Sequence, residues 1–216
     1  QISLIVNWMR VGFIHSVCNT DNVTISGETI DYGPCAFMNS YNPSTVFSSI
    51  DLKGRYSFGN QPLIAHWNLS RFAETLIPLI NNSEKNSIKI GSQIINEFSE
   101  NFKKAWTEMM KSKLGFINTQ SEDEKFIKNL LDWMEINKAD YTNTFCILMD
   151  EEGYNTEIYE RKSFKIIKNE FNKRIQKNKI KPDLSNNIMR SNNPLVIPRN
   201  HHVEESLKQI VKNNDY

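Results

Sequence analysis

Apolar residues recur at steps of three and four along most of the chain, and this spacing predicts amphipathic helices. The first 17 residues show the pattern, with an apolar stripe through Ile5, Met9 and Phe13. The same spacing predicts further helices over residues 62–80, 91–113, 121–134, 140–148, 163–175 and 201–211. The chain is therefore expected to be mainly α-helical.

Residues that favour helix starts stand at the heads of several of these segments. Pro62 suits the first turn of a helix, and Ser121 with Glu124 forms a capping-box sequence. Asp140 and Ser163 are suited to cap the helices that follow them. These positions predict where four of the helices begin.

One stretch, residues 22–33, changes to an alternation of period two, with β-branched residues on both sides of Ser26-Gly27. This pattern predicts a β-hairpin with a two-residue turn. In that register Asn22 lies opposite Asp31, and directly opposed residues point to the same face about 5 Å apart. The hairpin therefore predicts that these two side chains converge.

The other face of the predicted hairpin is apolar and is expected to pack on the helices; it consists of Val23, Ile25 and Ile30. The face of Asn22 and Asp31 is then left for a ligand. Residues 34–61 are rich in Asn, Ser and Pro without periodicity, and so long a loop is uncommon unless it serves a site or a partner. The expected fold class is mainly α with one small β-hairpin.

Composition narrows the class of protein. The 216 residues carry 26 Lys and Arg against 25 Asp and Glu, so nothing in the net charge favours nucleic acid as a partner. No long apolar run or signal pattern indicates a membrane. Three cysteines without a CxxC pair argue against a disulfide framework. We expect an intracellular, reducing compartment, and neither nucleic acid nor a membrane as a partner.

The polar face of the predicted hairpin has the chemistry of a divalent-metal site. The amide oxygen of Asn22 and the carboxylate of Asp31 are hard donors, which suit Mg²⁺ or Mn²⁺ held partly by phosphate and water. Asp21 stands one residue earlier and is placed to accept a proton from an attacking hydroxyl. This is the phosphoryl-transfer layout of kinase-like enzymes, although their base and Asn are separated by four residues and these two are adjacent.

Each of these signals also has a structural interpretation. Residues 19–22 suit an Asx-rich turn, and residues 31–33 an ordinary strand exit. His15 suits a structural hydrogen bond better than a catalytic role. Arg55 and Arg71 suit either phosphate clamps or surface ion pairs. Residue spacing by itself leaves these alternatives open.

The same residues carry a family resemblance. Residues 11–34, VGFIHSVCNTDNVTISGETIDYGP, resemble the selenoprotein O family of kinase-like proteins, whose members show G-F-x-H-G-V-x-N-T-D-N followed by T-I-D-Y-G-P. The likeness returns in family order at residues 41–43, 54–56, 60–62, 67–69, 71–73, 140–145 and within 193–204. It covers most of the chain, while 81–139 and 151–190 match only in helical character.

The resemblance implies a protein-kinase-like carboxyl lobe that transfers AMP, rather than phosphate, from ATP to Ser, Thr or Tyr hydroxyls of proteins. Matched by motif, Asp21 takes the place of the proton acceptor. Asn22 and Asp31 take those of the ligands of Mg²⁺ or Mn²⁺, and Asp31 thereby also holds the nucleotide. Residues 1–80 are expected to form the catalytic-loop and metal-binding segment, and residues 81–216 a helical, family-specific extension of the same lobe.

Two positions depart from the family pattern: Ser16 stands where the string usually has Gly, and Cys146 where an Arg usually follows T-N-T-F. The chain also begins at Gln1, inside a predicted helix. It shows no counterpart of the family's amino-terminal lobe, with its glycine-rich loop, or of the carboxyl-terminal Cys or selenocysteine motif. We therefore expect a carboxyl-lobe fragment of the enzyme that is inactive by itself.

Two alternatives remain at this point. One is a catalytically inactive pseudokinase lobe that serves as a protein-interaction module, with residues 34–61 as its contact surface. The other is true kinase activity, with transfer of the γ-phosphate. The resemblance implies the cytoplasm for a bacterial protein and mitochondria for a eukaryotic one.

Overall fold

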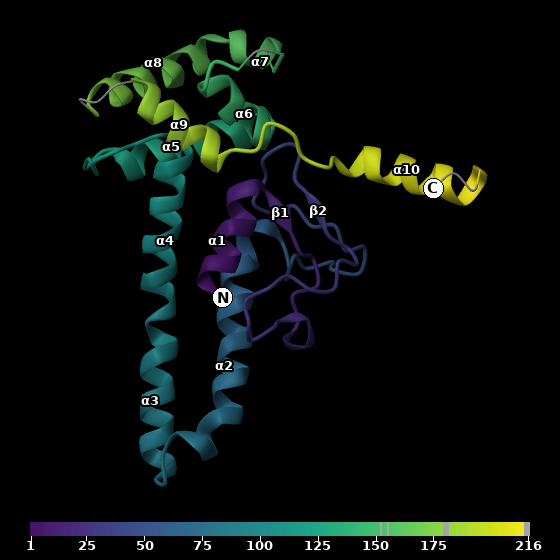
Figure 1. Cartoon of the computed structure of the whole chain (residues 1–216), viewed down its shortest axis with the longest axis vertical. Coiled ribbons are helices and arrows are strands. Elements are labelled where there is room, and N and C mark those ends of the chain that lie inside the picture. Colours follow the sequence, from purple (N-terminus) through teal and green to yellow (C-terminus); the bar gives the residue numbers. More distant parts are fainter. Residues whose placement is uncertain (152, 155, 179–181, 214–216) are drawn as a thin grey trace. The chain divides into compact units, whose positions relative to one another are not determined.

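Helices dominate the computed structural model of the chain, which describes residues 1–151, 153–154, 156–178 and 182–213 (Figure 1). The helices are α1 (Ile2–Val11), α2 (Gln61–Ile80), α3 (Glu84–Asn96), α4 (Phe98–Lys113), α5 (Asp123–Asn137), α6 (Tyr141–Leu148), α7 (Glu157–Glu160), α8 (Lys162–Gln176), α9 (Pro182–Asn192) and α10 (Asn200–Asn213). Short 3₁₀ turns cover Thr20–Asn22 (η1) and Phe58–Asn60 (η2). The mainly helical prediction is confirmed.

The chain forms two compact units that alternate along the sequence. The first consists of Gln1–Met9, Ile14–Cys35 and Pro43–Met109. The second consists of Arg10–Phe13, Ala36–Asn42 and the residues from Met110 onward. The division of one kinase-like lobe near residue 80 stays a prediction. Among the described residues, no helix has both the length and the apolar character of a membrane span.

The small β element exists, but not where the alternation predicted it. Strands β1 (Phe13–Ile14) and β2 (Ala36–Phe37) form a two-stranded antiparallel sheet. Residues 22–33 contain no strand, so the predicted hairpin is wrong. The amide of Gly27 donates to the carbonyl of Thr24 at 3.3 Å, which makes a tight turn one residue earlier than expected.

A side chain explains why the ladder does not form. The hydroxyl of Thr24 accepts from the amide of Glu28 at 3.0 Å and donates to the carbonyl of Glu28 at 2.9 Å. Both backbone groups of Glu28 thus find hydrogen-bond partners locally. Thr side chains in turns often bind nearby backbone groups in this way. The predicted apolar face is wrong as well, since Ile25 is 84% exposed.

In the first unit, α2 and α3 pack side by side (Figure 1). The ring of His66 on α2 stacks on Phe98 of α4 at a centroid distance of 5.2 Å. The start of α2 agrees with the position of Pro62. The single helix predicted over 91–113 is instead two helices, α3 and α4, which meet at Glu97.

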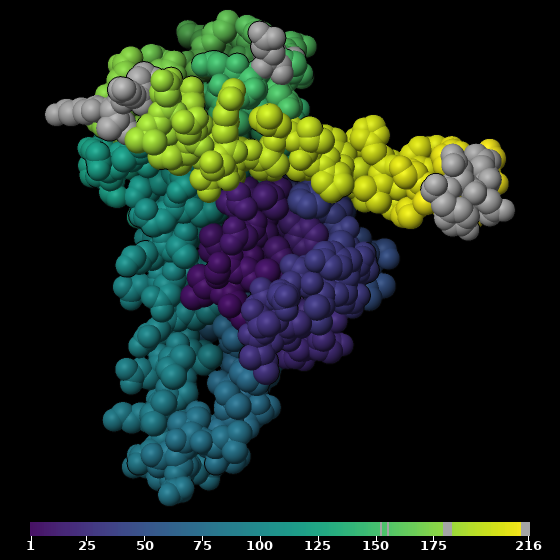
Figure 2. Space-filling model, viewed as in Figure 1, coloured from purple at the N-terminus to yellow at the C-terminus, as the bar shows by residue number. Residues whose placement is uncertain are grey.

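In the second unit, aromatic rings fill the space between α5 and α8. Phe116 lies 5.5 Å from Phe126 and 6.1 Å from Phe171, centroid to centroid. All three side chains are buried. By contrast, most described side chains of α10 are exposed (Figure 2).

One of the predicted caps is confirmed. The carboxylate of Asp140 accepts from the amide of Asn143 at 2.8 Å and begins α6. Arg199 donates to the same carboxylate at 2.7 Å and to the amide oxygen of Asn143 at 2.9 Å. This cap therefore joins two of the motif blocks that lie far apart in the sequence.

Two of the predicted caps are wrong. The helix α5 begins at Asp123, whose carboxylate accepts from the amide of Gln120 at 2.9 Å, so the capping box of Ser121 and Glu124 does not form. The helix α8 begins at Lys162, and the hydroxyl of Ser163 instead accepts from the indole of Trp133 at 3.0 Å. At α5 a neighbouring residue replaces the expected cap, and at α8 a residue 30 positions away takes the capping hydroxyl.

Candidate functional site

His15 holds the segment that leads into Asp31. Its side chain is 1% exposed, and its ring stacks on Trp8 at a centroid distance of 5.2 Å. The Nε2–H group donates to the carbonyl of Ile30 at 2.7 Å. The backbone amide of His15 donates to the side-chain oxygen of Gln61 at 3.2 Å. His15 is therefore a structural hydrogen bonder that positions the backbone beside Asp31.

Asp21 and Asn22 lie together in the 3₁₀ turn η1. The side chain of Asp21 is exposed, whereas Asn22 is half-buried. The amide nitrogen of Asn22 donates to the carbonyl of Val17 at 2.9 Å. Because that bond holds the nitrogen against the backbone, the side-chain oxygen is the group left for a ligand.

Side chains from distant segments bind the residues just before this turn. The buried amide of Asn68, on α2, donates to the carbonyl of Cys18 at 2.9 Å. The hydroxyl of Tyr56 donates to the side-chain oxygen of Asn19. Burial raises the pKa of the Cys18 thiol to about 11, so Cys18 stays neutral at physiological pH. Asn68 was not predicted as a site residue, although a polar side chain among the buried residues of a helix is a signal for such a role.

Asp31 adopts a backbone conformation that is unusual for a residue with a side chain. Its φ angle is +54°, in the left-handed region, and such residues cluster at functional sites. The side chain is exposed. Burial raises the pKa of the neighbouring Cys35 thiol, and the Asp31 carboxylate adds to that rise. The carboxylate of Asp31 is thus exposed to solvent, and the hydrogen bond from His15 to Ile30 holds the backbone beside it.

These residues supply oxygen donors of the kind that hard divalent cations prefer. The described residues contain no group of three or more His, Cys, Asp and Glu that could hold a metal. An ion bound by Asn22 and Asp31 would therefore need phosphate or water for its other ligands, which is usual for Mg²⁺. Because the hairpin ladder is absent, the convergence of Asn22 and Asp31 loses its register argument and stays a prediction.

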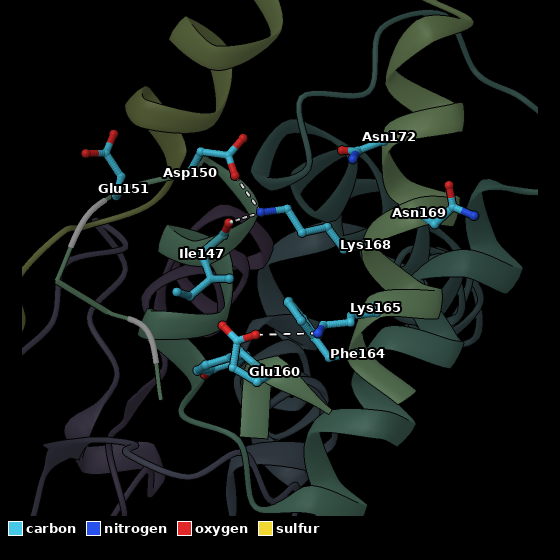
Figure 3. Close-up of a pocket in the computed structure, with 10 residues that line it drawn as sticks. Ile147, Asp150, Glu151, Glu160, Phe164, Lys165, Lys168, Asn169 and Asn172 are labelled. Atoms are coloured by element: carbon cyan, nitrogen blue, oxygen red, sulfur yellow. Dashed lines mark hydrogen bonds and ion pairs between the residues drawn. The ribbon is translucent and has the colours of Figure 1, made fainter. Parts of the chain in front are cut away.

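The second unit contains a cavity of about 430 Å³, and Figure 3 shows its lining. Lys168 donates to the carboxylate of Asp150 and, at 3.4 Å, to the carbonyl of Ile147. Lys165 faces Glu160 at 3.5 Å. Both lysines therefore already face an acid, and the motif residues do not line this cavity.

Comparison with known proteins gives a consistent result. The family model described as protein adenylyltransferase SelO matches residues 1–216. A protein nucleotidyltransferase YdiU from Pelagibacter ubique is 51% identical over 215 residues. Proteins of the same name from Clostridium botulinum and Bacillus mycoides are 50% and 49% identical over 216 residues. Each alignment covers 100% of this chain but 44% of the relative, so the chain spans less than half the length of these relatives.

Proposed function

The chain belongs to the SelO family of protein adenylyltransferases, and we propose on this basis that the protein that carries it transfers AMP from ATP to Ser, Thr or Tyr hydroxyls of other proteins. The observation that supports the proposal most directly is that the side chain of Asp21 is exposed while the residues before it are held by hydrogen bonds. Asn68 bonds to the backbone of Cys18, and Tyr56 bonds to the side chain of Asn19 just before Asp21. A base held this way is preorganised to receive a proton.

In the proposed reaction, the acceptor oxygen bonds to the α-phosphorus of ATP as the bond to pyrophosphate breaks. Asp21 takes the proton of the acceptor hydroxyl. Asn22 and Asp31 would hold Mg²⁺ or Mn²⁺, which would neutralise charge on the phosphates. The oxygen donors of these two residues fit that role, and nitrogen or sulfur ligands are not needed.

The proposal is tested with ATP labelled at the α- or the γ-phosphate, in the protein that carries this chain. Label from α-phosphate should reach protein, and label from γ-phosphate should not. Asp21→Asn should lower kcat roughly 10²–10⁴-fold, a typical general-base contribution. The exposed Asp132→Asn is the matched control and should retain wild-type kcat.

Asp31 has a separate test in the same assay. Asp31→Ala should abolish the transfer that Mg²⁺ or Mn²⁺ supports, and chelation with EDTA should do the same to the wild type. Transfer of the γ-phosphate label would identify a kinase instead. Wild-type rates in both the Asp21 and Asp31 variants would contradict the assignment of these residues.

A second candidate function is supported by the long loop. Within residues 34–61, Ile50 is 84% exposed and Leu52 is 92% exposed. Two such apolar side chains on one loop favour a contact with another protein. A catalytically inactive pseudokinase lobe that binds a partner would bind it equally well after Asp21→Asn and without ATP.

Two further expectations belong to the same proposal. The kinase-like carboxyl lobe is supported by the mainly helical fold and by the family match. A reducing compartment is supported by Cys18, Cys35 and Cys146, which are free thiols. The named relatives are bacterial, which favours the cytoplasm over mitochondria.

A further inference from the structure

Two arginines flank an exposed tryptophan on the first unit. The guanidinium carbon of Arg55 lies 4.8 Å from the ring centroid of Trp67, and that of Arg71 lies 5.6 Å from it. The ring of Trp67 is 40% exposed. Such cation–π contacts hold long arginine side chains in place while leaving their N–H groups free to bind anions.

The two arginines differ in whether an acidic side chain forms an ion pair with them. Arg71 pairs with Glu74 at 2.6 Å on the surface of α2. Arg55 contacts the rings of Trp67 and Tyr56, and its guanidinium makes no ion pair within the part of the chain that the structure describes. The carboxylate of Asp51 lies nearby but accepts from the backbone amides of Arg55 and Tyr56. A guanidinium that forms no ion pair of its own is suited to an acidic partner.

This pair of arginines is connected to the proposed catalytic turn. Arg55 directly precedes Tyr56, whose hydroxyl donates to Asn19. Asn19 stands two residues before Asp21. An anionic side chain bound at Arg55 would therefore belong to a segment that passes close to the proposed base.

A cavity of about 340 Å³ adjoins the same turn and helix. Thr20 and Val23, which flank Asp21 and Asn22, line one side. The other side belongs to α2, and Arg71 is part of the lining; the remaining lining residues include Leu69, Phe72, Thr75 and Ile25. The lining is mainly apolar and suits a hydrophobic side chain.

One residue that lines this cavity has a buried polar atom without a partner among the described residues. Asn68 lines the cavity and is 4% exposed. Its nitrogen is used by the bond to Cys18, but its Oδ1 atom has no hydrogen-bond partner among the described residues. A buried acceptor without a donor is destabilising, so the site favours an occupant that brings an N–H or O–H group.

We infer that this surface docks the acceptor segment of the protein substrate. An acidic side chain of the segment binds Arg55 and Arg71, an apolar side chain enters the cavity, and an N–H or O–H group bonds to Asn68. The inference rests on the proposed function and adds the substrate class to it. A polyphosphate would use the arginines but not the apolar cavity, whereas a peptide uses both.

The experiment uses two synthetic peptides with one Tyr acceptor and identical Leu residues. In one the Tyr is flanked by Glu, and in the other Lys replaces each Glu. The protein that carries this chain should transfer AMP to the Glu peptide with a KM at least about tenfold lower than that for the Lys peptide. This preference should shrink as salt is raised from about 50 to 500 mM, because the charges are exposed.

Variants then locate the two contacts. Arg55→Gln should raise the KM for the Glu peptide about five- to tenfold and leave the KM for ATP unchanged. Lys53→Gln removes the same charge from the same exposed loop and should leave the KM for the Glu peptide unchanged. Thr75→Trp, which fills the cavity from α2, should raise the KM for both peptides, since both carry the same Leu residues.

The outcomes separate the inference from the proposed function. Equal KM values for the two peptides would overturn the inference. A rise in the KM for ATP in Arg55→Gln would also overturn it, because the arginines would then be phosphate clamps. If α-labelled ATP modified no protein at all, including the enzyme itself, the proposed function would fall instead.

Discussion

Ser16 departs from the family pattern and also has a strained backbone conformation. Its φ angle is +51°, in the left-handed region where a side chain is unfavourable, and the resembling family usually has Gly at this position. The side chain is nevertheless used. Its hydroxyl accepts from the amide of Phe47 at 3.1 Å, and the residue is 1% exposed. The backbone strain therefore lowers the free energy of unfolding, and the hydrogen bond raises it.

Two substitutions separate these effects. Ser16→Ala loses the hydrogen bond and keeps the strain, so it should lower the free energy of unfolding by about 1–3 kcal/mol. Ser16→Gly loses the same bond but relieves the strain, and should be about 1 kcal/mol more stable than Ser16→Ala. Urea unfolding followed by circular dichroism measures both. An alanine variant as stable as the glycine variant would show that no strain is stored there.

Lys113 is buried and forms no ion pair with an acid among the described residues. Its side chain is 1% exposed, and its Nζ atom donates to the carbonyl of Arg10 and to the amide oxygen of Asn193, both at 2.7 Å. The ammonium lies 4.0 Å from the ring centroid of Phe145. Burial, with a smaller contribution from the charge of Arg10, lowers the pKa of Lys113 well below its ordinary value of 10.5.

The lowered pKa predicts a pH dependence of stability. Between the lowered pKa and 10.5 the unfolded chain keeps the Lys113 proton and the folded chain does not. The unfolded state then binds more protons, so the contribution of Lys113 to the free energy of unfolding rises with pH. Lys113→Met should therefore cost more stability at pH 10 than at pH 7. Chemical denaturation at both values tests this, and the exposed Lys104→Met should show no such difference.

At the scale of elements, one buried ion pair joins α5 to α8. The Nε atom of Arg174 lies 2.5 Å from the carboxylate of Asp123, and the two side chains are 4% and 1% exposed. Arg174 also donates to the side-chain oxygen of Asn178 at 2.7 Å and to the carbonyl of Asn118 at 2.9 Å. This pair, rather than the predicted capping box, decides how α5 begins.

Removing one member of this pair should be costly. Asp123→Ala leaves the guanidinium of Arg174 buried without its acid, and should lower the free energy of unfolding by about 3–5 kcal/mol. Replacing both members, Asp123→Leu with Arg174→Met, should cost less than Asp123→Ala alone. Urea unfolding measures both, with Lys128→Ala on an exposed pair as a control that changes stability by less than about 1 kcal/mol. A double variant less stable than the single one would contradict this.

At the scale of the whole molecule, the signature residues lie at the surface. Asp21 and Asp31 are both exposed in the 216 residues. A nucleotide bound there would be surrounded by water, where electrostatic positioning is weak. We therefore predict that residues 1–216 alone bind ATP weakly and transfer no AMP. Incubation with α-labelled ATP tests this, and labelled protein from these 216 residues would contradict it.

The sequence by itself determined the helical class and the family. The starts of α2 and α6 were predicted well, because Pro62 and the capping residue Asp140 act on neighbouring residues. The motif around Asp21, Asn22 and Asp31 identified the family because it is a string of neighbouring residues, which needs no knowledge of distant contacts.

Only the tertiary structure decided how the local preferences were used. The indole of Trp133 donates to the hydroxyl of Ser163, which the pattern predicted as a helix cap, from 30 positions away. The supports of the proposed site, such as the bonds from His15 to Ile30 and from Asn68 to Cys18, join residues 15 and 50 positions apart. Periodicity reports on neighbours within a few residues, so contacts of this length are decided when the segments pack.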